Sequence, residues 1–367
     1  MSGFATTLIR WQRRHGRHDL PWQDTRDPYR IWLSEVMLQQ TRVDAVIPYY
    51  ERFLDRFPDV RALARAPQGE VLRLWSGLGY YARARNLHAA ARRIVRMHAG
   101  RFPRSPEALA ALPGVGRSSA AAIAVFAFGR RAAILDGNVR RVLARYLGIE
   151  GFPGSPAVAR RLWALAESLL PQRSIRGYTQ GLMDLGATVC VRVRPRCDIC
   201  PFAAECVAAR RGLVERIPAP RPKGTRPVRD ARWLMPVHDG RVLLERRAAS
   251  GLWGGLWTFP QAEKCDARSV RHSLGCEIAA MRPLPPLEHG FTHFRLRVRP
   301  FLCEVSEPGP NIRRSSHRWF GIAQAARSAV PVPVKKLLHE LARLRQPLRG
   351  HDLVQETEPL KTVVRFQ

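Results

Sequence analysis

Residues 112–136 combine a glycine turn, an apolar helical run and a single acid, which together could hold a phosphate and act on the group attached to it. Gly114 and Gly116 lack a Cβ, so their turn can adopt left-handed backbone angles and bring its N–H groups close to a ligand. Ser118 stands at the start of the following helix, whose free N–H groups attract anions. Asp136 closes the stretch. Taken alone, the stretch also fits an ordinary connection between two helices.

A second carboxylate, Glu35, lies in an apolar segment with helical spacing over residues 31–57 and an expected break near Pro48. Its neighbours three and four residues away on a helix are mostly apolar: Ile31, Trp32, Leu38 and Gln39. Desolvation there favours the neutral carboxyl, which is the form that donates a proton at neutral pH. The alternative is a surface glutamate on an amphipathic helix.

Four cysteines follow one another at C-x6-C-x2-C-x5-C spacing: Cys190, Cys197, Cys200 and Cys206. Such a cluster in an intracellular chain indicates a metal centre in place of disulfides. The spacing alone leaves open a tetrathiolate zinc site and a 4Fe–4S cluster. Arg192 and Arg194 lie in the loop after the first thiol, so the metal would fold a basic loop that docks on phosphates.

The charge of the whole chain favours nucleic acid as the partner. Its 367 residues include 61 Lys and Arg against 30 Asp and Glu, for a formal net charge of +31. Such an excess favours a polyanion through phosphate contacts. A preference for arginine as the surface cation explains Arg in place of Lys, but not the twofold excess of bases. The first 222 residues contain no lysine, so a lysine Schiff base cannot form within them.

The elements that must position these groups divide the chain into two predicted domains. Residues 1–206 show short helical patterns, and the Pro- and Arg-rich residues 207–229 look like a linker. Residues 230–345 show strand patterns and a closing helix, an α+β domain, and residues 346–367 form a tail. No apolar run approaches the roughly 18 residues of a membrane span, and no signal peptide is evident. We therefore expect a soluble cytoplasmic protein, associated with the nucleoid if bacterial.

These motifs, in this order, resemble the adenine DNA glycosylases of the MutY type, in the endonuclease III superfamily. The resemblance rests on SEVMLQQTRV (34–43), LPGVGRSSA (112–120), ILDGNVRRVL (134–143) and the four-cysteine spacing. It implies an all-α helix-hairpin-helix glycosylase domain over residues 1–206, with a 4Fe–4S cluster loop at 190–206. It also implies a Nudix-like lesion-recognition domain over residues 230–345.

Two features favour the MutY branch within that superfamily. Ser118 occupies the position of the nucleophilic lysine of bifunctional endonuclease III enzymes, and GLWGGLWTFPQ (251–261) belongs to a C-terminal domain that endonuclease III lacks. The stretch EKCDARSVRHSLGCEI lacks the clustered glutamates with which Nudix hydrolases hold magnesium, so we interpret the domain as a binding module. Phe291, Thr292 and His293 resemble the family's Phe-Ser-His contact to 8-oxoguanine, with Thr retaining the hydroxyl.

The resemblance implies a monofunctional enzyme that flips out adenine mispaired with 8-oxoguanine or guanine and hydrolyses its glycosidic bond, leaving an abasic site. Glu35 would protonate the base, Asp136 would stabilise the cation that develops on the sugar, and Asn138 would position water or the acid. The expected partner is duplex DNA containing such mispairs, with no membrane and a monomeric protein. Further DNA contacts are expected from Gln40, Tyr80, Gly114, Gly116, Ser118, Arg140, Arg192 and Arg194.

Three alternatives remain open at this stage. One is an endonuclease III-like glycosylase that also cleaves abasic sites, and another is a non-catalytic DNA-binding protein stabilised by its metal. The third is a Nudix-type nucleotide hydrolase, which the missing carboxylates weaken. Tyr80 and its neighbour Tyr81 fit a core role as well as a role in the DNA stack.

Overall fold

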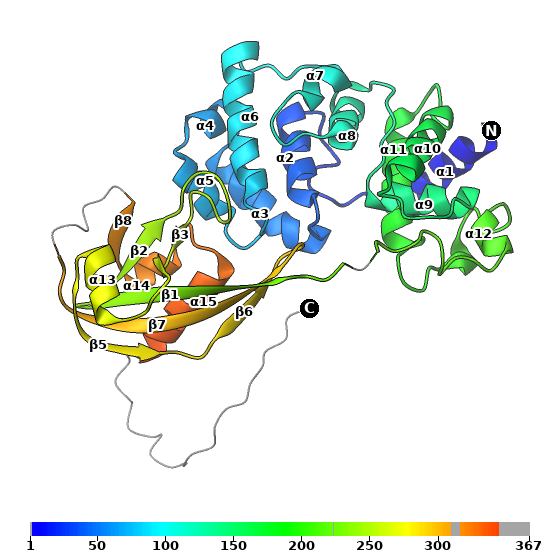
Figure 1. Cartoon of the computed structure of the whole chain (residues 1–367). Coiled ribbons are helices and arrows are strands. Elements are labelled where there is room, and N and C mark those ends of the chain that lie inside the picture. Colours follow the sequence, from blue (N-terminus) through cyan, green and yellow to red (C-terminus); the bar gives the residue numbers. More distant parts are fainter. Residues whose placement is uncertain (1, 223, 310–315, 345–367) are drawn as a thin grey trace, which may run out of the picture. The chain divides into compact units, whose positions relative to one another are not determined.

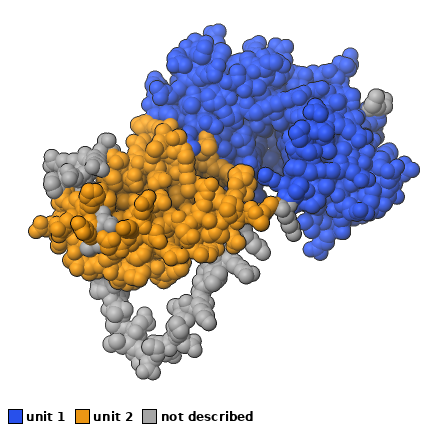
Figure 2. All heavy atoms as spheres, in the orientation of Figure 1, with its two compact units in different colours: residues 1–66, 83–223 blue, residues 67–82, 224–367 orange. Residues whose placement is uncertain are grey.

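The computed structural model describes residues 2–222, 224–309 and 316–344, which form two compact units (Figure 1). The helical unit comprises residues 1–66 and 83–223, and the sheet unit comprises residues 67–82 and 224–367 (Figure 2). The predicted tail at residues 346–367 lies outside the described residues. Among the described helices, none has both the length and the apolar character that a membrane span requires.

The helical unit is built from short helices joined at Pro, Gly and capping residues. Asp27 accepts a hydrogen bond from the Tyr29 N–H and so caps α2, while Gly129 and Gly148 end two later helices in left-handed conformations. The helices are α1 (Ser2–His15), α2 (Pro28–Leu38), α3 (Val43–Arg56), α4 (Val60–Arg65), α6 (Ala82–His98), α7 (Pro106–Ala110), α8 (Arg117–Phe128), α9 (Gly137–Leu147), α10 (Pro156–Ser168), α11 (Ile175–Thr188) and α12 (Val207–Arg210), with a 3₁₀ turn at Cys197–Ile199.

Two packing groups make up this unit. Helix α2 packs against α3 and α8, and α11 packs against α1, α8 and α9. The second group shares one apolar core with fully buried Leu8, Leu143 and Leu162 at its centre. Because α8 contacts both groups and is buried along most of its length, it fixes the hairpin before it and the acid after it.

The predicted break near Pro48 is wrong. Pro48 lies inside α3, and the chain breaks instead between α2 and α3, where Gln40 has a positive φ of 58°. A proline costs a helix one hydrogen bond at most positions, a cost that buried packing of Val46, Tyr50 and Phe53 offsets. The break at Gln40 has a tertiary cause.

The predicted linker is too long. Within residues 207–229, Ala208 and Ile217 are buried in the core of the helical unit, and the first strand of the sheet unit begins at Val228. Residues 67–82 are a second departure from the predicted domains, since they pack with the sheet unit. Helix α5 (Gln68–Leu74) lies in this segment, after which the hydroxyls of Ser76 and Tyr81 donate to the Val330 carbonyl.

The sheet unit holds one mixed sheet, whose main strand order is β3-β2-β1-β7-β5. Strands β1 and β7 are parallel, and the other pairs are antiparallel. The strands are β1 (Val228–His238), β2 (Arg241–Arg246), β3 (Trp257–Thr258), β4 (Gln261–Ala262), β5 (Glu277–Pro283), β6 (Leu287–Gly290), β7 (Arg295–Glu307) and β8 (His317–Gly321).

Helices cover both faces of this sheet, as its two sets of alternating apolar residues require. Helix α13 (Ala267–Leu274) buries Val270 and Leu274 against one face, and α15 (Val332–Leu344) buries Leu337 and Leu338 against the other. A short helix, α14 (Ile322–Ala326), precedes α15. The result is the α+β domain expected from the sequence.

Candidate active site

The glycine turn before α8 is a hairpin that leaves space in front of the helix N-terminus. Gly114 has a φ of +76°, and a Cβ there would lie 2.7 Å from Cβ of Asn86, so only glycine fits without a shift. Gly116 is different, because it caps α8 with an ordinary φ of −83° and a Cβ there would meet nothing within 4 Å. The left-handed prediction therefore holds for Gly114 and fails for Gly116, which instead leaves space in front of the helix N-terminus.

Asp136 is held in place by its own helix and by the hairpin helix. Its Oδ1 accepts a hydrogen bond of 2.8 Å from the Val139 N–H and so caps α9. One residue earlier, the Leu135 N–H donates to the Ser118 hydroxyl at 2.9 Å. Burial raises the pKa of Asp136, although two backbone N–H groups and two nearby arginines act in the opposite direction. Ser118 thus holds the backbone of the residue that precedes Asp136.

Glu35 lines a cavity of about 470 Å³ in the helical unit. Apolar side chains on its own helix and on α8 contribute to the wall, among them Ile31, Leu38 and Phe126. Burial, followed by the negative charge of Asp136, raises the pKa of Glu35 to about 8. The two carboxyl groups are therefore close enough to interact, and the raised pKa keeps Glu35 protonated at neutral pH.

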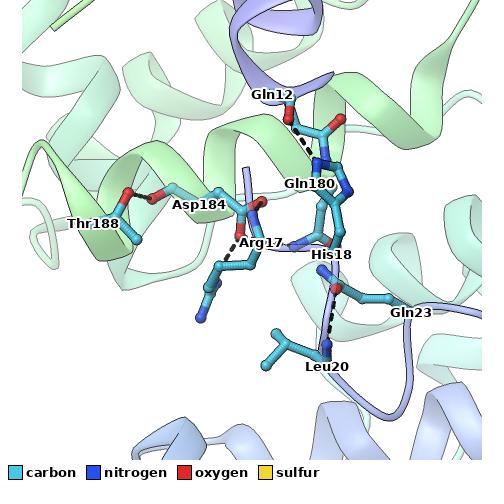
Figure 3. Close-up of polar contacts among 8 residues, drawn as sticks. All are labelled: Gln12, Arg17, His18, Leu20, Gln23, Gln180, Asp184 and Thr188. Atoms are coloured by element: carbon cyan, nitrogen blue, oxygen red, sulfur yellow. Dashed lines mark hydrogen bonds and ion pairs between the residues drawn. The ribbon is translucent and has the colours of Figure 1, made fainter. Parts of the chain in front are cut away.

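A polar network contributes part of the wall of the same cavity and extends behind it to Asp184 on α11 (Figure 3). Asp184, fully buried, accepts hydrogen bonds from Arg17 Nε at 2.8 Å, from the Arg17 N–H at 3.1 Å and from Gln180 Nε2 at 3.0 Å. Because its amide nitrogen is engaged with Asp184, Gln180 has its carbonyl oxygen available as an acceptor. His18, also at the wall, contacts the Gln12 carbonyl at 3.1 Å.

Removing the Asp184 carboxylate should destabilise the helical unit. Asp184→Ala leaves the partly buried Arg17 guanidinium without its partner, so we expect the free energy of unfolding to fall by about 2–3 kcal/mol. Urea unfolding followed by circular dichroism measures it. Asp44→Ala is the matched control, because Asp44 pairs with Arg42 where both side chains are more than four-fifths exposed. Equal midpoints for the two variants would contradict the expectation.

Asn138 is connected to the cysteine loop by Arg141, a residue that sequence reasoning missed. Arg141 Nη2 donates to Asn138 Oδ1 at 2.8 Å and to the Gly186 carbonyl at 2.6 Å, while its Nε donates to the Cys190 carbonyl at 2.7 Å. A Cβ on Gly186 would lie 2.6 Å from Cβ of Asn138, so this contact needs glycine. The only sequence signal was the three-residue spacing of Asn138 and Arg141 on one helix.

All four cysteines of the predicted metal centre line one cavity, together with Arg145. None of them is in a disulfide. Arg145 is 2% exposed, and its guanidinium donates to the Cys190 sulfur at 3.4 Å and to the Val191 carbonyl at 2.6 Å. Within the described residues, no ion pair gives Arg145 an acidic partner. A buried cation facing four thiols fits an anionic thiolate centre.

The described residues contain no group of three or more His, Cys, Asp or Glu side chains placed to hold a single metal ion. A zinc ion needs its sulfur ligands about 2.3 Å away from it. No such arrangement of ligands around one ion is present among the residues that the structure describes.

The residues predicted to contact DNA differ in solvent exposure and in their hydrogen bonds within the protein. Arg192 and Arg194 are exposed in the cysteine loop, and Gln40 is exposed between α2 and α3. Arg140 is engaged internally, since its guanidinium donates to the Leu135 and Pro153 carbonyls at 3.1 and 3.2 Å. It thereby supports the backbone beside Asp136, and a phosphate contact from it stays a prediction.

In the sheet unit, the structure brings two of the predicted recognition residues together. Tyr80 is 51% exposed with a φ of 48°, whereas Tyr81 is buried, so only Tyr81 has the core role. The Tyr80 hydroxyl lies 3.4 Å from the Thr292 hydroxyl, which comes from 212 residues further along the chain. Thr292 and His293 are exposed at a turn that is closed by a 2.9 Å hydrogen bond from the Phe291 N–H to the Phe294 carbonyl.

Comparison with known proteins finds a matching family for each of the two units. Residues 33–168 match the HhH-GPD superfamily of base excision DNA repair proteins, and residues 232–340 match the NUDIX domain. The chain is 33% identical over 342 residues to the adenine DNA glycosylase of Buchnera aphidicola subsp. Acyrthosiphon pisum, covering 93% of this chain and 98% of that protein. The chain belongs to the adenine DNA glycosylase family. It is thus an enzyme of DNA base excision repair with a helix-hairpin-helix unit and a Nudix-like unit.

More distant relatives show the same relationship. The human adenine DNA glycosylase is 32% identical over 403 residues, which cover 92% of this chain and 73% of the human protein. Among solved structures, a thermostable thymine-DNA glycosylase is similar with a TM-score of 0.52 and 31% identity, covering 57% of this chain and 96% of that one. This second similarity concerns a glycosylase of different base specificity, so the scaffold alone does not select the base.

Proposed function

We propose that this glycosylase excises adenine mispaired with 8-oxoguanine or guanine, by hydrolysis and without cutting the strand. One observation carries the chemistry: Glu35, at the wall of a cavity, has a pKa of about 8 and interacts with the Asp136 carboxylate. Enzymes that cleave glycosidic bonds commonly use a pair of carboxyl groups, one of which donates a proton. The family relationship then selects adenine as the base.

Glu35 serves as the proton donor. The bond from C1′ of the sugar to N9 of adenine breaks with its electron pair going to the base, and an adenine anion is a poor leaving group. A proton transferred from Glu35 to N7 neutralises that charge. The polar cavity wall offers the Gln180 carbonyl oxygen as an acceptor, which suits the exocyclic amino group of adenine and opposes a carbonyl at the same place.

Asp136 faces the developing cation. Loss of the base leaves positive charge on C1′ and the ring oxygen, which an ionised carboxylate stabilises either through space or through a transient bond. Water then attacks C1′ and returns a proton to the enzyme. Asn138, whose Oδ1 accepts from Arg141, is oriented with its amide nitrogen free to hold that water or the acid.

The residues near Asp136 support hydrolysis without strand cleavage. A lyase forms a Schiff base between an enzyme amine and C1′ of the sugar, and the helical unit carries no lysine before residue 223. Ser118, at the lysine position of the bifunctional branch, is engaged as an acceptor for the Leu135 N–H. These facts favour the monofunctional enzyme over the glycosylase that also cleaves abasic sites.

Recognition of the base opposite adenine is assigned to the sheet unit. Thr292 and His293 are exposed on a turn whose Phe291 ring stacks on Phe294 at 4.5 Å, and the Tyr80 hydroxyl lies beside Thr292. An exposed hydroxyl beside a stacking ring can recognise a base by hydrogen bonding and stacking together. This support, with the Phe-Ser-His resemblance, favours 8-oxoguanine.

Single-turnover cleavage of duplexes tests the function. Adenine, guanine, cytosine and thymine are each placed opposite 8-oxoguanine, and alkali added afterwards reveals abasic sites. We expect cleavage only of the adenine strand and only after alkali. Scission without alkali, with an adduct trapped by borohydride, would overturn the monofunctional assignment. Cleavage of no adenine duplex would overturn the function itself.

We further propose that Cys190, Cys197, Cys200 and Cys206 hold a 4Fe–4S cluster, with Arg145 as a buried counter-charge. The cluster, when bound, would organise the basic loop that carries Arg192 and Arg194. Cys200→Ser should lower the iron content and the visible absorption, and should lower the midpoint of thermal unfolding. Cys265→Ser, in the sheet unit, should change neither iron nor absorption. Undiminished iron in Cys200→Ser would contradict the ligand assignment.

A further inference from the structure

The turn between α2 and α3 is held by a buried arginine from a distant helix. Arg83, 8% exposed on α6, points its guanidinium at this turn. Its Nη1 donates to the carbonyls of Val36, Met37 and Gln39 at 3.1, 2.6 and 2.6 Å, and its Nη2 donates to the Thr41 hydroxyl at 3.0 Å. One side chain therefore binds four acceptors within six residues of chain.

These contacts explain why the chain breaks at this turn. The last carbonyls of a helix have no partner inside the helix, and Arg83 supplies partners for those of Val36 and Met37. Gln40, three residues after Met37, has a φ of 58°. This left-handed conformation costs a non-glycine residue about 1–2 kcal/mol. The hydrogen bonds to Gln39 and Thr41 on either side offset this cost. A tertiary contact thus creates a strained turn that local sequence disfavours.

The turn is also tied to the hairpin. Gln39 Nε2 lies 3.4 Å from the Gly114 carbonyl and 3.3 Å from the Ser119 hydroxyl, both at the hairpin. With Gln39 held on one side and Thr41 on the other, Gln40 is left exposed at the tip. Glu35 lies five residues earlier on the helix that this turn ends. The tip therefore has a defined position relative to both the phosphate-binding hairpin and the catalytic acid.

We propose that Arg83 is a positioning residue that holds Gln40 ready to enter the DNA stack when the target base leaves it. This inference rests on the proposed excision of a flipped base. Because Arg83 orders the turn before DNA binds, the conformational entropy of ordering it is not lost on binding. That loss would otherwise reduce the fraction of complexes in which the target base is flipped out. Lysine keeps the charge of arginine but cannot reach four acceptors spread over the turn, since it lacks the planar fork.

The test measures base flipping apart from chemistry. Arg83→Lys is placed in the Glu35→Gln background, and 2-aminopurine beside the target adenine reports unstacking by its fluorescence on binding. We expect the flipping equilibrium to fall by roughly tenfold, the effect of losing a hydrogen bond to a charged donor. Duplex affinity should change less, because Arg83 is buried. An unchanged fluorescence response would overturn the proposal.

A double-mutant cycle separates positioning from a general loss of structure. If Arg83 acts through Gln40, then Gln40→Ala alone should reduce flipping, and adding Arg83→Lys to it should reduce flipping no further. Additive effects would overturn the proposal and leave Arg83 a residue of folding only. Thr41→Val, which removes one of the four acceptors, is a milder variant that should show a smaller loss in the same direction.

The same measurements distinguish this inference from the function on which it rests. Excision by the protein with both residues unchanged tests the proposed reaction, whereas the fluorescence cycle uses catalytically silent protein. A native protein that flips adenine normally but excises none would contradict the reaction. Native excision with no coupling between Arg83 and Gln40 would contradict the positioning role.

Discussion

Glu35→Gln is expected to slow adenine excision by about 10³-fold, within the range that general acid catalysis contributes. Glutamine has nearly the same shape but cannot give N7 a proton, so duplex binding and flipping should persist. Single-turnover cleavage of an adenine:8-oxoguanine duplex measures the rate, and a binding titration provides the control. Retained excision in this variant would remove Glu35 from the mechanism.

The pH dependence follows from the raised pKa of Glu35. A proton donor must be protonated, so excision should fall as pH rises above about 8. The same shift affects stability, since a folded-state pKa above the unfolded one gives a contribution that is full at low pH and lost as pH rises toward 8. Glu35→Gln cannot ionise, so it should melt higher than the native protein at pH 9. Identical melting temperatures at pH 9 would show that burial does not raise the Glu35 pKa.

Asp136→Asn is expected to reduce excision by about 10²–10³-fold, a typical loss for removing one electrostatic contact to a transition state. Asparagine keeps an oxygen that can accept from the Val139 N–H, so the cap on α9 should survive. The rate comes from single-turnover cleavage, and circular dichroism checks the fold. Asp136→Ala serves as the comparison, because it should lose the cap as well and melt at a lower temperature.

This variant also tests the coupling between the two carboxyl groups. The charge of Asp136 helps to raise the pKa of Glu35, so neutralising Asp136 should move the alkaline limb of the residual activity to lower pH. A limb that stays near pH 8 would mean that burial alone sets the Glu35 pKa. Full activity in Asp136→Asn would contradict its role at the cation.

The sequence by itself determined the parts of this protein that depend on local spacing. The hairpin glycines, Asp136 at the head of a helix and the four-cysteine loop can each be found within about twenty residues of chain. Ser118 in a segment without lysine was equally visible, as was the change from helical to strand patterns that separates the two units. Such signals can be recognised in the sequence because backbone turns, helix caps and metal-binding loops are built from residues that are close together in the chain.

Only the tertiary structure decided which distant groups meet. It brought Asp136 within electrostatic reach of Glu35, placed Arg141 between Asn138 and the Cys190 carbonyl, and put the Tyr80 hydroxyl beside Thr292. The physical reason is that helical periodicity specifies which face of an element is buried, but not which element covers it or which carbonyls a long side chain reaches. Arg83 shows this most clearly: its hydrogen bonds hold the turn at Gln40, beside the active site, whereas Pro48 lies inside a continuous helix.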